Sequence, residues 1–216
     1  MSVAVKICGL STAETVNAAI EAGASLVGFV FYPPSPRNVT VETANTLAKL
    51  ARGKARIVAL VVDPDDALID RIANGLKPDL IQAHGGESPE RISEIAKRTG
   101  IPVIKAIKVK DRSDIDQATA YDASAALILY DAKVPETLIG ALPGGNGIAF
   151  DWSLIEGPAR EKPFILSGGL NPGNVAEAIR NTGAAIVDVS SGVEKAPGVK
   201  DIGLIRNFIE AAKGAR

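Results

Sequence analysis

The chain's only cysteine is one of the residues best suited to acid–base chemistry. Cys8 ends the apolar run Val3–Cys8 and is followed by Gly9. A thiolate can accept a proton, and Lys6, two residues earlier, is expected on the same strand face, where its ammonium would lower the pKa of the thiol. Two alternatives stay open: Cys8 as a small buried apolar residue, and Lys6 as an interior charge paired with a carboxylate.

An aspartate, the only histidine and an arginine also stand where chemistry is expected. Asp131 directly follows the apolar run Ala125–Tyr130, and burial there would favour a protonated carboxyl that can donate a proton. An aspartate that merely begins a loop is the alternative. His84 fits a hydrogen-bonded structural residue as well as a functional one. Arg37 follows the proline-rich segment 33–36, where its guanidinium could bind a carboxylate through two hydrogen bonds or simply lie in solvent.

Two glycine-containing turns predict an anion site. Gly168 and Gly169 follow one apolar run, and Ser191 and Gly192 follow the next one. Glycine lets backbone N–H groups approach an anion closely, so these four residues are predicted to bind phosphate. The alternative is a pair of ordinary tight turns.

These residues lie among eight β-branched, apolar runs that are predicted to be strands. Segments with helical spacing separate the runs, and four consecutive runs start 23 residues apart, at 56, 79, 102 and 125. Such alternation predicts a parallel sheet, and eight repeats predict a closed (β/α)8 TIM barrel that forms a single domain over residues 1–216. An open doubly wound sheet is the alternative. The predicted strands are Val3–Cys8, Leu26–Phe31, Arg56–Val62, Asp79–Ala83, Pro102–Lys108, Ala125–Tyr130, Pro163–Ser167 and Ala185–Val189.

In a barrel of this kind the active site forms at the C-terminal ends of the strands, and the candidate residues follow those ends. Cys8, His84 and Asp131 fall on that rim, with Arg37 in the loop after the second strand. The two glycine turns leave strands seven and eight, where barrels often bind phosphate. The long connection from Asp131 to Phe150 follows strand six, and it could be a lid over the site or an insertion without a role.

Composition and charge exclude several classes of function. The 216 residues are 46% apolar and 23% charged, and 24 Lys and Arg against 25 Asp and Glu leave a net charge of −1. This balance provides no basic surface for nucleic acid or an anionic membrane, and no apolar run is long enough for a membrane span. One cysteine forms no internal disulfide, and with one histidine it makes no Cys/His zinc cluster. Since Lys6 interrupts the first apolar run, export is not expected. We therefore predict a cytoplasmic protein without a bound metal or cofactor.

The motifs of the chain resemble the phosphoribosylanthranilate isomerases of tryptophan biosynthesis, from the first predicted strand to the last. A single piece such as segment 167–169 is common, but the motifs together are highly specific. They are Val5–Leu10, Gly28–Pro33, Ser35–Arg37, Gln82–Gly85, Asp131–Lys133, Gly144–Gly147, Phe150–Trp152, Leu166–Leu170 and Asp188–Glu194.

The resemblance implies a barrel enzyme that acts on a phosphosugar without a cofactor, as a monomer or a homodimer. The implied reaction is an Amadori rearrangement of N-(5-phosphoribosyl)anthranilate, an aminoaldose, to the aminoketose 1-(o-carboxyphenylamino)-1-deoxyribulose 5-phosphate. By the same resemblance Cys8 is the general base, Asp131 is the general acid, and Arg37 contacts the anthranilate carboxylate. His84 and Asp188 become substrate contacts, and the two glycine turns become the phosphate site.

Two other functions compete with the isomerase. An indole-glycerol-phosphate synthase is also a barrel enzyme that handles a phosphosugar, but its chemistry relies on lysines and glutamates, so Cys8 with Arg37 argues against it. A non-catalytic barrel that binds a phosphate ligand would keep the glycine turns. It would not need Cys8 and Asp131 on the same rim.

Overall fold

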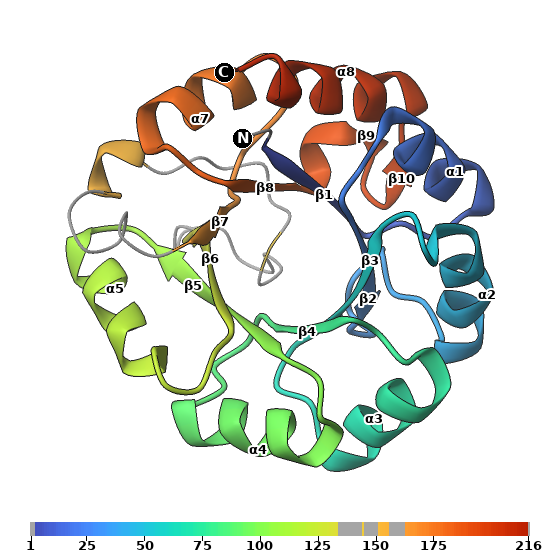
Figure 1. Cartoon of the computed structure of the whole chain (residues 1–216), viewed down its shortest axis with the longest axis vertical. Coiled ribbons are helices and arrows are strands. Elements are labelled where there is room, and N and C mark those ends of the chain that lie inside the picture. The colour runs from blue at the N-terminus through green and yellow to red at the C-terminus, as the bar shows by residue number, and fades with distance from the viewer. Residues whose placement is uncertain (1–2, 134–143, 145–150, 156–162, 216) are drawn as a thin grey trace.

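The computed structural model describes residues 3–133, 144, 151–155 and 163–215. Eight parallel strands pair in chain order and close into a barrel, which Figure 1 shows inside a ring of helices. The predicted closed barrel is confirmed, and the open sheet is wrong because β1 pairs with both β2 and β8. The strands are β1 (Ala4–Cys8), β2 (Leu26–Phe31), β3 (Arg56–Val61), β4 (Leu80–Ala83), β5 (Val103–Val109), β6 (Leu127–Ala132), β7 (Phe164–Leu166) and β8 (Ile186–Val189).

Apart from α7 (Val175–Thr182), the described α-helices begin at polar side chains that cap their free backbone N–H groups. Thr12 accepts a hydrogen bond at the start of the first helix and Ser88 at the start of the fourth, while Gly23 ends the first helix in the left-handed region at φ 88°. The α-helices are α1 (Ala13–Ala22), α2 (Val41–Ala51), α3 (Asp66–Arg71), α4 (Pro89–Thr99), α5 (Arg112–Asp116), α7 (Val175–Thr182) and α8 (Ile202–Lys213). Shorter elements are the π-helix η1 (Ile72–Leu76), the 3₁₀ helices η2 (Gln117–Tyr121), η3 (Trp152–Leu154) and η4 (Ser191–Val193), and the hairpin of β9 (Glu194–Ala196) and β10 (Val199–Lys200).

Alternation of side chains along the strands places the polar residues at one end of the barrel. Leu80 of β4 and Leu129 of β6 belong to an apolar cluster inside the barrel, together with Leu26, Val58, Ile104, Ala106 and Ile165. Gln82 and Asp131 stand two residues further along the same two strands and therefore share the inward face. The interior thus changes from apolar to polar toward the C-terminal ends of the strands.

The predicted strand bounds agree with the structure to within two residues. The difference that matters is at Asp131, which was expected just after the sixth strand and lies within it. Pairing with β5 continues through Lys108 opposite Asp131 and Val109 opposite Ala132, so the carboxyl is held by the sheet rather than by a loop.

A buried ion pair ties β5 to the loop that precedes α4. Lys105 Nζ donates to Glu87 Oε2 and to the carbonyl oxygen of Gly85, at 2.7 Å each, and the two charged side chains are 3% and 1% exposed. Burial raises the pKa of Glu87, but the Lys105 ammonium outweighs it and leaves that pKa below its ordinary value.

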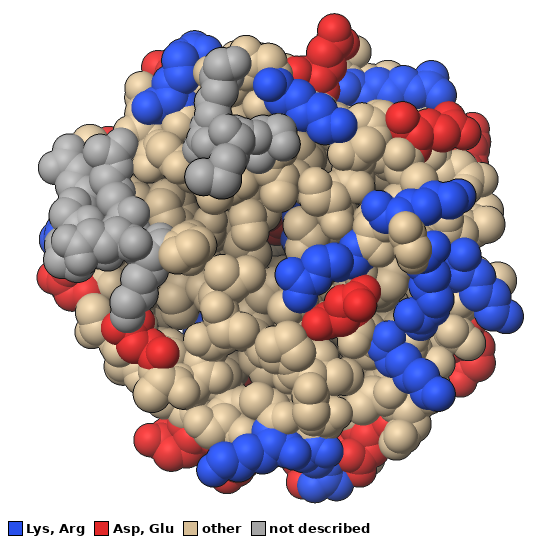
Figure 2. Space-filling view, viewed as in Figure 1, with Lys and Arg blue, Asp and Glu red and all other residues tan. Residues whose placement is uncertain are grey.

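The outer surface carries most of the charge. In Figure 2, Lys, Arg, Asp and Glu side chains lie mostly around the circumference of the face, and uncharged atoms cover most of its middle. Among the described residues, no helix is both long and apolar enough to cross a membrane.

Candidate active site

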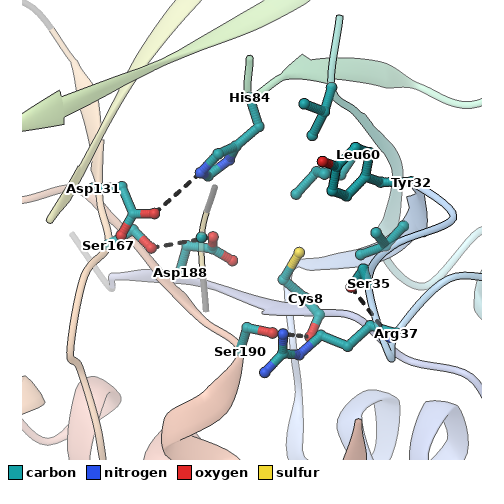
Figure 3. A pocket seen from close by; sticks show the side chains of 13 residues that line it. Cys8, Tyr32, Ser35, Arg37, Leu60, His84, Asp131, Ser167, Asp188 and Ser190 are labelled. Carbon is teal, nitrogen blue, oxygen red and sulfur yellow. Dashed lines mark hydrogen bonds and ion pairs between the residues drawn. The ribbon is translucent and has the colours of Figure 1, made fainter. Parts of the chain in front are cut away.

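A cavity opens at the C-terminal ends of the strands, where a small-molecule site is expected in a barrel of this kind. It brings together five of the side chains predicted from sequence: Cys8, Arg37, His84, Asp131 and Asp188. Figure 3 shows Cys8 between the Asp131–His84 pair on one side and Arg37 on the other. The rest of the described lining consists of Val30, Tyr32, Ser35, Leu60, Val62, Gly144, Ser167 and Ser190.

Cys8 is 3% exposed and ends β1 beside Gly28 of β2. A Cβ at Gly28 would lie 3.0 Å from the sulfur and 3.3 Å from Lys6 Cε, so this glycine makes room for both side chains. Burial raises the pKa of the Cys8 thiol and the Lys6 ammonium lowers it in part, with a net rise. The predicted fall in the thiol pKa is therefore wrong, because loss of water around the thiolate outweighs the charge of Lys6.

Lys6 forms a buried ion pair with Asp188, as the alternative from sequence proposed. Its Nζ donates to Asp188 Oδ1 at 2.9 Å, and the register of β1 and β8 sets the two residues opposite each other. Burial lowers the pKa of Lys6, but Asp188 and Cys8 outweigh it and hold that pKa above its ordinary value. The other carboxylate oxygen of Asp188 accepts a hydrogen bond from Ser167 Oγ at 3.5 Å, so its orientation at the cavity wall is fixed from two sides.

Asp131 and His84 are paired in the wall of the cavity. His84 Nε2 lies 3.1 Å from Asp131 Oδ2, and the two side chains are 6% and 8% exposed. Asp131 Oδ1 accepts a hydrogen bond from the backbone N–H of Ala132 at 3.0 Å. On the other side of the imidazole ring, Gln82 Nε2 lies 2.9 Å from His84 Nδ1. His84 is thus hydrogen-bonded on both nitrogens and connects Gln82 to the predicted acid.

Arg37 is held at the cavity by Glu194. Its Nε and one terminal nitrogen donate to the two carboxylate oxygens at 2.7 and 2.8 Å, and Arg37 is 5% exposed, so a solvated surface arginine is wrong. Lys200 Nζ donates to Glu194 Oε1 at 2.7 Å and to the carbonyl oxygen of Ser190 at 2.9 Å. Burial raises the pKa of Glu194, but the two cations outweigh it and leave that pKa below its ordinary value. Glu194 and Lys200 belong to the β9–β10 hairpin, which therefore supports the arginine from behind.

The two glycine turns after β7 and β8 lie beside the cavity. Gly168 and Gly169 have φ of 84° and 63°, in the region that favours glycine. A Cβ at Gly192 would lie 1.9 Å from the carbonyl oxygen of Leu170, so the two turns pack directly on each other. The described cavity lining includes their neighbours Ser167 and Ser190 rather than the turns themselves. Turn geometry and packing account for these glycines, and phosphate binding at Gly168, Gly169, Ser191 and Gly192 stays a prediction.

The predicted lid between Asp131 and Phe150 lies mostly outside the described residues. Gly144 is described, and it rests on the Asp131–His84 pair: a Cβ there would lie 2.7 Å from His84 Nε2 and 3.1 Å from Asp131 Oδ2. The lid itself stays a prediction.

Sequence reasoning gave no role to Gln82, Glu194 or Lys200, although Gln82 and Glu194 lie within two of the family motifs. Gln82 stands two residues before His84, and the two-residue period of a strand could have placed it on the same face. Glu194 lies 157 residues from Arg37 along the chain, so no local pattern predicts their pairing.

The arrangement is suited to acid–base chemistry on a small molecule. A thiol from β1 and a carboxyl from β6 face one cavity, and a buried arginine lies at its edge. In the part of the chain that the structure describes, no group of three or more His, Cys, Asp or Glu side chains could hold a metal ion.

Comparison with known proteins identifies the family. The family model described as N-(5'phosphoribosyl)anthranilate (PRA) isomerase matches residues 5–211. The chain belongs to this family. It is 53% identical over 215 residues to the N-(5'-phosphoribosyl)anthranilate isomerase of Parvibaculum lavamentivorans and 51% identical over 216 residues to that of Paramagnetospirillum magneticum, with 100% of each chain covered in both comparisons.

Solved structures of PRA isomerases agree with the fold. The enzyme from Thermotoga maritima has a TM-score of 0.87 at 40% identity, over 98% of this chain and 99% of that one. A PRA isomerase in complex with reduced 1-(o-carboxyphenylamino)-1-deoxyribulose 5-phosphate has a TM-score of 0.84 at 38% identity, over the same shares of the two chains. The resemblance predicted from sequence is thus confirmed, and the chain is an enzyme of the aldose–ketose isomerase class. Neither the indole-glycerol-phosphate synthase nor the non-catalytic barrel is supported.

Proposed function

We propose that this chain converts N-(5-phosphoribosyl)anthranilate to 1-(o-carboxyphenylamino)-1-deoxyribulose 5-phosphate in tryptophan biosynthesis, with Cys8 as general base and Asp131 as general acid. The observation that carries the assignment of roles is that these two side chains, from β1 and β6, line one cavity. The rearrangement needs a proton donor and a proton acceptor at different atoms of one substrate, so two separate groups in one site match its demands.

The chemistry divides between the two groups. Asp131 donates its proton to the furanose ring oxygen, the C1′–O bond breaks, and the nitrogen lone pair forms the protonated Schiff base. The Cys8 thiolate then removes the proton from C2′, and the electron pair of that C–H bond forms the enol-amine. Transfer of a proton from the enol oxygen to C1′ through solvent gives the ketone. The product is an isomer of the substrate, so no redox partner or co-substrate is consumed.

The surroundings of Cys8 explain how a buried thiol can act as a base. Burial raises the pKa of the thiol, which gives the thiolate a strong affinity for the C2′ proton once it forms. The Lys6 ammonium partly offsets this rise and supplies a positive charge beside the sulfur. Asp188 holds that ammonium in place through their 2.9 Å ion pair. Asp188 therefore acts on the base through Lys6 as well as lining the cavity.

The two charged ends of the substrate are assigned to two different groups at the cavity. Arg37 binds the anthranilate carboxylate, since its guanidinium is buried at the cavity and already oriented by Glu194. The phosphate is assigned to the backbone of the turns at Gly168 and Gly192, because the turns of strands seven and eight pack together beside the cavity.

The cellular setting and the assembly follow the same proposal. We expect a cytoplasmic location, because the Cys8 thiol must stay reduced to serve as a base. A solved relative from Thermotoga maritima is described as a dimer from which monomers were generated. All side chains assigned to acid–base chemistry here come from one chain, so either a monomer or a homodimer is compatible with the activity.

The test is loss of anthranilate-type fluorescence when purified protein meets freshly prepared N-(5-phosphoribosyl)anthranilate. Cys8→Ser removes the anionic base and Asp131→Asn removes the acidic proton, and each should lose most of the activity, since a general acid or base contributes about 10²–10⁴-fold. Both variants should still bind the reduced product analogue, because neither change opens a large cavity.

Asp114→Asn is the matched control. Asp114 is also a buried aspartate, but its carboxylate accepts hydrogen bonds from the backbone of Lys110 and Asp111. The Asp114→Asn variant should retain full turnover. Near-normal turnover of Cys8→Ala would show that the cysteine is a core residue and would refute the mechanism. Inorganic phosphate should compete with the substrate, and a bulky residue at Gly192 that left KM unchanged would contradict the phosphate assignment.

A further inference from the structure

Three hydrogen-bonded side chains inside the barrel, Gln82, His84 and Asp131, lead to the proposed acid. Gln82, at the start of this series, is not among the described residues that line the cavity. Gln82 is fully buried in β4, and its Nε2 lies 2.9 Å from His84 Nδ1. Its other end, Oε1, has no hydrogen-bond partner among the described residues. A buried amide oxygen without a donor costs free energy, so a glutamine at this place in an otherwise apolar strand interior needs an explanation.

The explanation begins at the acid. Asp131 can act as a general acid only if one of its oxygens carries a proton. Oδ1 accepts the backbone N–H of Ala132 at 3.0 Å, so the proton belongs on Oδ2, which faces His84 Nε2 at 3.1 Å. An O–H group at Oδ2 can donate only if Nε2 offers a lone pair. The neutral imidazole must then carry its hydrogen on Nδ1, and that hydrogen needs an acceptor on the side of Gln82.

Gln82 can supply that acceptor by rotating only its terminal carboxamide group. The oxygen and nitrogen of a carboxamide have nearly the same shape, so a half turn of the amide exchanges them at one position. With Nε2 toward the ring, Gln82 donates to Nδ1, the ring hydrogen sits on Nε2, and Asp131 is held as a carboxylate. With Oε1 toward the ring, Gln82 accepts from Nδ1–H, Nε2 accepts from Asp131, and the acid keeps its proton until the ring oxygen of the substrate replaces Nε2 as the acceptor. The half turn gives Oε1 a donor and places Nε2 where no partner is described, so the reason for the half turn is the proton on Asp131 and not the count of hydrogen bonds.

We propose that Gln82 is a positioning residue that turns its carboxamide oxygen to His84, fixes the imidazole as the Nδ1–H tautomer, and so holds the catalytic proton on Asp131. The inference rests on the proposed role of Asp131 as the general acid. Gln82 itself touches neither the substrate nor the reacting atoms; it acts through His84, whose second nitrogen is the partner of the acid.

The chain offers a direct measurement, because His84 is its only histidine. In protein labelled with ¹⁵N-histidine, the two ring nitrogens give a single pair of signals whose chemical shifts distinguish Nδ1–H, Nε2–H and the doubly protonated ring. We expect Nδ1–H in the wild type. Nε2–H, or a doubly protonated ring across the pH range of activity, would overturn the inference.

Two substitutions separate hydrogen bonding from packing. Gln82→Met removes both donor and acceptor at similar length, so the signals should move away from pure Nδ1–H. Gln82→Glu offers only oxygens when ionised and should keep the hydrogen on Nδ1. Leu80→Met is the matched control. Leu80 is buried on the same face of β4 and belongs to the apolar cluster of the interior, and its exchange for methionine nearly conserves side-chain volume. It should leave the tautomer and the turnover unchanged.

Kinetics supply the second readout. Gln82→Met should lower kcat by about 10-fold or more, up to the 10²–10⁴-fold that a general acid contributes, and leave KM nearly unchanged, because no substrate contact is lost. Gln82→Glu should restore part of the lost kcat. Equal kcat in Gln82→Met and the wild type would overturn the inference, as would a tautomer that does not respond to Gln82→Met.

The outcome is separable from that of the proposed function. If Asp131→Asn is inactive while the wild type shows Nε2–H, the acid assignment stands and the role of Gln82 is wrong. If Asp131→Asn stays active while the wild type shows Nδ1–H, the assignment of Asp131 as the acid fails. Gln82 then orients His84 only, and its proposed effect on the catalytic proton is refuted as well.

Discussion

Replacing Lys6 by methionine tests whether its ion pair with Asp188 supports both the barrel and the base. Lys6→Met removes an ammonium that is 0% exposed and keeps an unbranched side chain of similar length, so little cavity is opened. Asp188, 4% exposed, then keeps Ser167 as its described side-chain partner but loses the charge that compensates its own. The variant thus isolates the cost of an unpaired buried carboxylate.

The expected loss is large for a single substitution. Removing one partner of a buried ion pair destabilises a protein by about 3–5 kcal/mol. In a chain of this size each kcal/mol lowers Tm by about 2–4 °C, so Tm should fall by about 6–20 °C. Loss of the ammonium also removes the larger of the two positive charges' effects that lower the pKa of Cys8, and that pKa should rise further.

Thermal unfolding and ultraviolet titration of the thiolate measure the two effects separately, and the single cysteine makes the titration unambiguous. The double variant Lys6→Met with Asp188→Asn is the control. Because it removes both charges, it should be more stable than Lys6→Met alone. A Tm unchanged in Lys6→Met, or a double variant less stable than the single one, would refute this account of the pair.

Three further outcomes are expected. Because burial holds the pKa of Cys8 above its ordinary value, less of the thiol is ionised at neutral pH than in a free cysteine; the ultraviolet signal of the thiolate should therefore rise with a midpoint above the ordinary thiol pKa, and a midpoint below it would contradict the burial argument. Glu87→Gln leaves the Lys105 ammonium buried and should cost about 3–5 kcal/mol of unfolding free energy in denaturant titrations, whereas Glu94→Gln, which breaks an exposed pair with Arg91, should cost less than about 1 kcal/mol. Arg37→Ala should weaken binding of the product analogue more than it lowers kcat, and an unchanged dissociation constant in calorimetry would remove its assigned role.

The architecture could be predicted from sequence because it depends on local patterns. Apolar runs at regular spacing determine the strands, and the end of each run determines which residues reach the rim. Cys8, His84 and Asp131 were therefore found in one cavity, together with Arg37 from the loop after β2. The motifs added the family, which composition and spacing alone do not distinguish from other barrels.

Pairings between distant residues could not be predicted in this way. Lys6 and Asp188 are 182 residues apart, and only the closure of β8 on β1 makes them neighbours. The prediction that the pKa of Cys8 is lowered was wrong for a related reason. A lysine two residues away is visible in the sequence, but burial around the sulfur depends on residues that are distant in the chain and meet only in the folded barrel.

The two hydrogen bonds from Arg37 to Glu194 have a consequence for the thermodynamics of binding. An arginine side chain carries about 2 kcal/mol of rotamer entropy, which a flexible arginine loses when it closes on a ligand. Here two hydrogen bonds of 2.7 and 2.8 Å immobilise the guanidinium during folding, before any ligand arrives. The carboxylate that Arg37 is proposed to bind would therefore meet a preorganised surface and lose less affinity to side-chain ordering. The hairpin of β9 and β10, which makes no bond with the substrate in this scheme, thereby shifts part of the entropic cost of recognition from binding to folding.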